Sequence, residues 1–219
     1  TDIATGWTEC APLLFREQRL LSEVLTVLRE AMPFTLLGFD TDNDTVFINA
    51  TVKDWCDGGD IAFTRSRPYR KNDQAHIEQK NGAVVRRMVG YRRLEGLAAA
   101  EALARLYRPM RLFVNFFQPS FRLVEKRREG GLVRKRYDKP ATPHQRLIAD
   151  PRTPEAVKAA VAARHGELDP VRLPAEIRAA QQALVDVADR APTPAPGEVP
   201  LTTFLEGLRV AWREGEVRP

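Results

Sequence analysis

Residues 34–44, FTLLGFDTDND, combine a short apolar run with a cluster of aspartates, and this combination indicates an α/β protein. The run FTLLGF is short and largely apolar, follows Pro33 and gives way to three aspartates. A short apolar run with such boundaries is typical of a buried strand. Open α/β sheets bind their ligands at the carboxyl ends of their strands, so Asp42 is the first candidate for a functional residue.

The segments around this strand predict alternating helices and strands. Residues 17–32 carry Leu20, Val24 and Val27 at helical spacing, and Pro33 ends that helix. A second amphipathic helix is predicted over residues 45–56 and a short strand over residues 61–64, while residues 3–15 alternate enough to predict two short strands. This order of elements predicts an α/β fold.

The rest of the chain is expected to contain further helices and one hairpin. Helices are predicted over residues 74–88 and 94–107, the second of which ends before Pro109. Residues 124–137 predict a basic β-hairpin, because Gly130 and Gly131 suit the positive φ angles of a tight turn. Residues 154–164, 174–190 and 201–212 predict three more helices.

These elements divide the chain into four expected parts, because 219 residues can bury one ordinary core and leave length for appendages. Residues 1–108 are expected to form the core, and residues 109–150 a basic extension with the hairpin. Residues 151–190 form a helical segment, and residues 191–219 a proline-rich linker with a terminal helix. Four phenylalanines at near-helical spacing are predicted to be core residues, namely Phe113, Phe116, Phe117 and Phe121.

The charge of the chain is concentrated in its middle third. The net charge is +5, but residues 65–146 hold 21 basic and 7 acidic side chains, a net charge of +14. Such a segment is typical of a polyanion-binding protein, since neutralising phosphates releases their counterions. The alternative is a basic face that is merely solvated.

Cysteines, histidines and hydropathy argue against several classes of protein. Cys10 and Cys56 stand 46 residues apart without a CxxC spacing, and the three histidines are widely separated, so neither a disulfide framework nor a zinc site is predicted. No apolar run approaches the roughly 20 residues of a membrane span. We expect a reducing, cytoplasmic compartment and no membrane partner.

A second carboxylate lies in the most basic stretch. Residues 63–81, FTRSRPYRKNDQAHIEQKN, hold five basic residues and two acids, one of which is Glu78 in the helix predicted over residues 74–88. Magnesium prefers carboxylate oxygens, and one or two carboxylates with a substrate phosphate are its usual ligands. Asp42 and Glu78 therefore predict a metal site for phosphodiester chemistry. The alternative is that neither residue is functional, with Asp42 simply ending a strand and Glu78 lying on the surface of a helix.

Several long segments occur together in this order: DTDNDTVFIN, FTRSRPYRKNDQAHIEQKN, VVRRMVGYRRLEG and YRPMRLFVNFFQPSFRLVEKRREGGLVRKRYDKPATPHQRLI. With them, residues 1–148 resemble the catalytic core of DDE-type bacterial insertion-sequence transposases, which are related to retroviral integrases. The resemblance implies an RNase H-like fold, a mixed five-stranded sheet flanked by helices. It also implies that Asp42 and Glu78 are the second and third catalytic carboxylates and ligands of Mg²⁺ (or Mn²⁺), and that Asn81 matches a polar position near the site.

The sequence departs from the family pattern in two places. The first catalytic Asp of the family lies on the strand before TDIATGWTE, so that strand and its Asp are expected upstream of Thr1; Asp2 matches a non-catalytic position. Asp44 stands where the family has glycine. Asp tolerates a left-handed turn better than most residues, but a further negative charge beside Asp42 can perturb its pKa or its metal binding.

The resemblance implies an enzyme that binds double-stranded DNA, exposes a 3′ hydroxyl and joins it to target DNA. We expect a homo-oligomer on DNA, associated with the bacterial nucleoid. Two alternatives stay open: a non-catalytic DNA-binding remnant of a transposase, and an RNase H-like nuclease that cuts without joining. The residues predicted to contact DNA are Arg65, Arg67, Arg70, Lys71, Lys80, Asn81, Arg87, Lys126, Arg127, Arg128, Arg134, Lys135 and Arg136.

Overall fold

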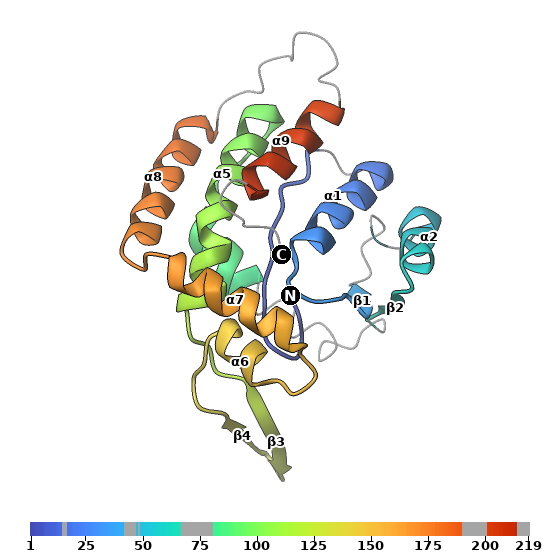
Figure 1. The fold of residues 1–219 in the computed structure, drawn as a ribbon, viewed down its shortest axis with the longest axis vertical. Coiled ribbons are helices and arrows are strands. Elements are labelled where there is room, and N and C mark those ends of the chain that lie inside the picture. The colour runs from blue at the N-terminus through green and yellow to red at the C-terminus, as the bar shows by residue number, and fades with distance from the viewer. Residues whose placement is uncertain (15–16, 42–46, 48, 67–80, 190–200, 214–219) are drawn as a thin grey trace.

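The computed structural model describes residues 1–14, 17–41, 47, 49–66, 81–189 and 201–213. Most of these residues belong to a helical body, from whose lower end a β-hairpin extends (Figure 1). Helix α5 (Gly96–Leu112) packs against α8 (Arg172–Val187) and α9 (Leu201–Arg213), and α1 (Gln18–Ala31) packs against α9 and α2 (Ala50–Gly58). Among the described elements, no helix combines the length and apolar character needed to cross a bilayer.

The predicted apolar stripe of α1 is confirmed, and it lies in the core. Leu20, Val24 and Val27 are buried together with residues of α5 and α9. A second face of α1 packs on α2, where Trp55 Nε1 donates to Thr26 Oγ1 at 2.9 Å. Asn49 caps α2 by accepting a hydrogen bond from Val52 N at 2.9 Å. The helices predicted around the apolar run of residues 34–39 are therefore both formed.

The described residues contain two sheets of two strands each, so the α/β class is confirmed. Strand β1 (Gly38–Thr41) pairs in parallel with β2 (Ala62–Arg65). The prediction of a buried strand over residues 34–39 was wrong in its position and burial, because β1 begins only at Gly38, Leu37 is 78% exposed and Thr41 is the one buried residue of β1. Strands β3 (Leu123–Glu129) and β4 (Leu132–Tyr137) form the predicted antiparallel hairpin, with Gly130 at φ 61° in its turn. A five-stranded RNase H-like sheet is not seen among these residues and stays a prediction.

The two short strands predicted in residues 3–15 are not formed in the described residues 1–14. Trp7, Thr8 and Glu9 are buried in succession, so the segment does not alternate between buried and exposed side chains as a half-buried strand does. Its neighbour, however, is a side chain: Thr8 N donates to Asn115 Oδ1 at 2.8 Å, and Asn115 Nδ2 donates to Thr8 O at 2.9 Å. The amide of Asn115 thus satisfies the backbone groups that a partner strand would otherwise pair.

Helix α5 does not end before Pro109, so that prediction was wrong. It runs through Pro109 to Leu112 and continues as the π-helical segment η2 (Phe113–Phe117). A proline inside a helix loses its N–H hydrogen bond and its ring crowds the carbonyl four residues earlier, and the burial of Leu106 and Met110 offsets that cost. Phe116 is buried as predicted, whereas the side chain of Phe121 is 62% exposed, so its assignment to the core was wrong.

The C-terminal helices lie close to their predicted positions. They are α7 (Glu155–Glu167), α8 and α9. The short helix α6 (Pro143–Ala149) precedes them, and in its capping box Gln145 N donates to Thr142 Oγ1 at 3.1 Å.

Of the helix predicted over residues 74–88, the described part consists of η1 (Asn81–Arg86) and α4 (Arg87–Val89). Gln181 Nε2 of α8 donates to Met88 O at 2.9 Å. The four-part division of the chain stays a prediction.

Candidate functional site

The carboxyl edge of the β1–β2 pair is the first candidate site. In the parallel register Thr41 lies beside Arg65, so both strands end at the same edge. Asp42 directly follows Thr41, and residues 67–80 directly follow Ser66. Both predicted carboxylates, Asp42 and Glu78, lie outside the described residues, as do Arg67, Arg70, Lys71 and Lys80.

This edge carries two buried hydroxyl groups without a hydrogen-bond partner in the described structure, Thr41 Oγ1 and Ser66 Oγ. The two residues are 3% and 2% exposed, and their backbones are joined by a hydrogen bond from Ser66 N to Thr41 O at 2.9 Å. Leaving such a group unsatisfied costs about 1–3 kcal/mol. The edge therefore holds polar atoms that a ligand could satisfy.

The residues of this edge fit a magnesium site in their chemistry. Hydroxyl and carboxylate oxygens are hard ligands of the kind that Mg²⁺ prefers, and Thr41 and Ser66 supply hydroxyls next to Asp42 and to the segment that holds Glu78. Asp40 is exposed on β1 and accepts a hydrogen bond from Thr64 Oγ1 at 2.7 Å. Within the described ranges, no group of three or more His, Cys, Asp or Glu side chains could hold a metal ion.

Three further predicted DNA-contacting residues belong to described elements. Arg65 is exposed at the end of β2, and Arg87 is exposed in α4. Asn81 begins η1. Next to Arg87, the guanidinium of Arg86 lies 5.2 Å from the centre of the Tyr91 ring, in a cation–π contact that sequence reasoning missed.

The hairpin is the second candidate site, and it carries the remaining six predicted residues. All six are exposed: Lys126, Arg127, Arg128, Arg134, Lys135 and Arg136. The base of the hairpin is fixed to the body, since Arg122 N donates to Asp138 Oδ1 at 2.7 Å and Arg122 Nη1 donates to Ala4 O at 3.0 Å. The structure therefore presents a dense group of cations on a ribbon that extends away from the helices (Figure 1).

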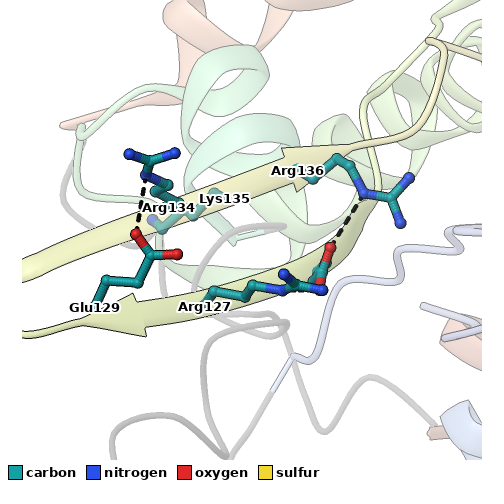
Figure 2. A pocket seen from close by; sticks show the side chains of 6 residues that line it. Arg127, Glu129, Arg134, Lys135 and Arg136 are labelled. Carbon is teal, nitrogen blue, oxygen red and sulfur yellow. Dashed lines mark hydrogen bonds and ion pairs between the residues drawn. The ribbon is translucent and has the colours of Figure 1, made fainter.

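Two glutamates neutralise part of the charge of the hairpin. Glu125 accepts hydrogen bonds from Arg127 and, at 3.3 Å, from Arg136 Nε. Glu129 lies 3.5 Å from Arg134 Nε, and Figure 2 shows Arg134 directed across the ribbon at Glu129. The sequence predicted the six cations but did not show which of them pair with these acids.

A buried ion pair that the sequence did not predict joins the N-terminal segment to α5. Arg111 donates to Glu9 through Nε at 2.5 Å and through Nη2 at 2.9 Å, and the two side chains are 6% and 1% exposed. Trp7 Nε1 donates to Glu9 Oε1 at 2.8 Å, and Arg111 Nη2 also donates to Ala31 O at 3.2 Å. These contacts satisfy both charges within the core, which indicates a structural role. A separation of 102 residues left no local signal in the sequence.

Two histidines that are widely separated in the sequence stack on each other. The ring centres of His144 and His165 lie 4.7 Å apart with an interplanar angle of 15°, and Phe116 and Phe117 flank them. His144 Nε2 is buried without a hydrogen-bond partner among the described residues. Burial lowers the pKa of His144, and the neighbouring His165 lowers it further. The stack is a packed structural cluster, and no third ligand for zinc adjoins it in the described structure.

The His144 pKa predicts that acid destabilises the protein. Because the pKa in the folded state lies below the value of 6.5 for a free side chain, the unfolded chain binds the proton first. The stabilisation by neutral His144 is therefore present above pH 6.5 and is lost as pH falls below it. We expect His144→Phe to weaken this pH dependence, measured by urea unfolding at about pH 7.5 and about pH 5.5. If the unmodified protein and His144→Phe lost the same stability between these two pH values, the role of His144 would be contradicted.

The fold and the two candidate sites describe an α/β protein with an exposed basic hairpin. The chain is 56% identical over 143 residues to the uncharacterized protein y4rM of Sinorhizobium fredii (strain NBRC 101917 / NGR234). The aligned part is 65% of this chain and 41% of y4rM, so the chain spans about two fifths of the length of that relative. No protein-family model and no solved structure matches the chain.

Proposed function

We propose that the chain carries the catalytic core of a DDE-type DNA transposase. The observation that carries this proposal is the parallel pairing of β1 and β2, whose carboxyl ends lead directly into Asp42 and into the basic residues 67–80 that include Glu78. Ligand sites of α/β proteins lie at such an edge. The resemblance of residues 1–148 to transposase cores supports the assignment, and the RNase H-like five-stranded sheet belongs to the same proposal.

The proposed reaction is cleavage of a phosphodiester followed by transfer of the 3′ hydroxyl to target DNA. Asp42 and Glu78 would hold Mg²⁺ (or Mn²⁺), together with the first Asp that the resemblance implies. When bound, these ions activate the attacking oxygen and stabilise the leaving oxygen of an in-line displacement. The basic side chains around the edge would bind phosphates and so hold the DNA in register with the carboxylates.

The proposed partner is double-stranded DNA, both at the element ends and at the target. The net charge of +14 over residues 65–146 supports it, as does the exposure of Arg65, Arg87 and the six cations of the hairpin. Pairing two DNA ends before joining requires more than one active site, so we propose a homo-oligomer on DNA, at the bacterial nucleoid.

The DNA-binding part of the proposal predicts a specific salt dependence. Arg65→Gln and Arg87→Gln should each lower the slope of log affinity against log salt by about one unit, because each removes one phosphate contact. The loss should be the same for unrelated duplex sequences, since phosphates carry no sequence information. The slope is measured by fluorescence anisotropy over a salt series, with Arg178→Gln of α8, another exposed arginine, as the control. An unchanged slope would remove the substituted residue from the interface.

A non-catalytic DNA-binding protein is the second candidate function, and Asp44 is the feature that favours it. This residue replaces the family's glycine and adds a negative charge close to Asp42 in the sequence. The basic hairpin suits both candidates equally. An assay for joined DNA product separates them, because only the transposase forms that product.

A further inference from the structure

We propose that the β3–β4 hairpin contacts DNA through one of its two faces, which carries Lys126, Arg128 and Lys135. The inference rests on the proposed function, because its partner is the phosphate backbone of duplex DNA. It goes further by separating the six cations of the hairpin into three that bind phosphate and three whose charge is largely neutralised within the protein.

The strand register assigns the cations to faces. Successive side chains of a strand point to opposite faces, and directly paired residues share a face. Lys126 pairs with Lys135, and Arg128 pairs with Val133, so these four residues form one face, called the lysine face. The opposite face, called the glutamate face, is formed by Glu125, Arg127, Glu129, Leu132, Arg134 and Arg136.

The two faces differ in charge. On the glutamate face, three arginines against two glutamates leave a net charge of +1, and three ion pairs join all five of these residues. The lysine face carries three cations and no acid, a net charge of +3. No ion pair of these three cations occurs among the described residues, and all three are exposed. A polyanion is therefore attracted mainly to the lysine face.

The lysine face also has an unfavourable arrangement that an anion would relieve. Lys126 lies directly opposite Lys135, and like charges in that position destabilise a strand pair. On the glutamate face, Arg127 also lies opposite Arg134, but there Glu125 and Glu129 compensate the repulsion. A bound phosphate would compensate the lysine pair in the same way.

Duplex DNA matches the spacing of these cations. Alternate residues of a strand lie about 7 Å apart, and a duplex carries about one negative charge per 1.7 Å of its axis. The three cations can therefore meet several phosphates at once. Contacts of this kind are made to the backbone and not to base edges, so we expect binding without sequence preference.

Two variants of the 219-residue chain test the assignment, with binding of a duplex oligonucleotide measured over a salt series. Neutralising the lysine face with Lys126→Gln, Arg128→Gln and Lys135→Gln should lower the salt slope by about three units, since each contact contributes about 0.9. Neutralising all five charges of the glutamate face with glutamine should lower it by about one unit or less. Thermal unfolding of both variants shows whether the body remains folded.

A third variant, Glu125→Gln with Glu129→Gln, keeps every cation and releases three arginines from their acids. The inference predicts a steeper salt slope for it, by up to about two units. A slope that stays constant or falls would overturn the neutralising role of the two glutamates. Equal losses of about three units in the first two variants would overturn the division into faces and leave the proposed function intact. Absence of salt-dependent DNA binding by the unmodified chain would overturn the proposed function itself.

Discussion

Arg111→Met is expected to lower the free energy of unfolding by about 3–5 kcal/mol, because it leaves the charge of Glu9 buried without its partner. Glu9 is 1% exposed, and Trp7 Nε1 would be its remaining donor among the contacts described above. A typical domain is stable by about 5–15 kcal/mol, so the loss is a large part of the total. Urea unfolding with linear extrapolation measures it.

Two further variants show whether the unpaired charge is the cause. Glu9→Gln combined with Arg111→Met removes both charges and keeps an acceptor for Trp7, so it should recover much of the lost stability. Arg105→Met, which replaces an exposed arginine of the same helix, should change stability by less than about 0.5 kcal/mol. A double variant as unstable as Arg111→Met alone would show that packing, and not the charge of Glu9, accounts for the loss.

Glu78→Gln is expected to reduce DNA strand joining by at least about 100-fold. Loss of a residue that only hydrogen-bonds to a metal ligand already lowers metal affinity or activity by about 10–100-fold, and loss of a ligand itself should have a larger effect. The substitution keeps the shape of the side chain and removes the charge that would hold the metal. Joining is measured with a protein that carries Asp42, Glu78 and the first Asp of the family pattern, using a labelled DNA end and a plasmid target. DNA binding should be unchanged, since the variant keeps every basic residue of the interface.

The neighbouring Gln79→Glu provides the matched control, since it adds a carboxylate one residue away from the proposed metal ligand. Its joining activity should stay within a few-fold of the unmodified protein. Retained joining in Glu78→Gln would remove Glu78 from the metal site. A joint loss of joining and DNA binding would indicate that the variant had lost its folded structure, and not only a metal ligand.

Local patterns predicted the helices and the hairpin because their causes lie within a few residues. Leu20, Val24 and Val27 recur at helical spacing, and they are buried on one face of α1. Gly130 takes the positive φ angle that its place between two basic strands indicated. Such elements need no partner that is remote in the sequence to be recognised.

Sequence reasoning failed where remote partners decide the structure. The alternation of residues 3–15 indicated strands, but the partner of Thr8 is the side chain of Asn115, 107 residues away. Pro109 indicated a helix end, but α5 continues through it because the neighbouring Leu106 and Met110 pack in the core. The ion pairs of Glu125 and Glu129 depend on the register across the hairpin, which residue types alone did not reveal.

Magnesium-dependent joining of a DNA end to a target is the decisive assay for the transposase assignment. A protein that carries Asp42, Glu78 and the first Asp of the family pattern is incubated with a duplex bearing a free 3′ hydroxyl and a circular target, with Mg²⁺ or with a chelator. The account predicts covalently joined product with Mg²⁺ and none with the chelator. DNA binding without joined product under both conditions would contradict the transposase assignment and leave a non-catalytic DNA-binding protein.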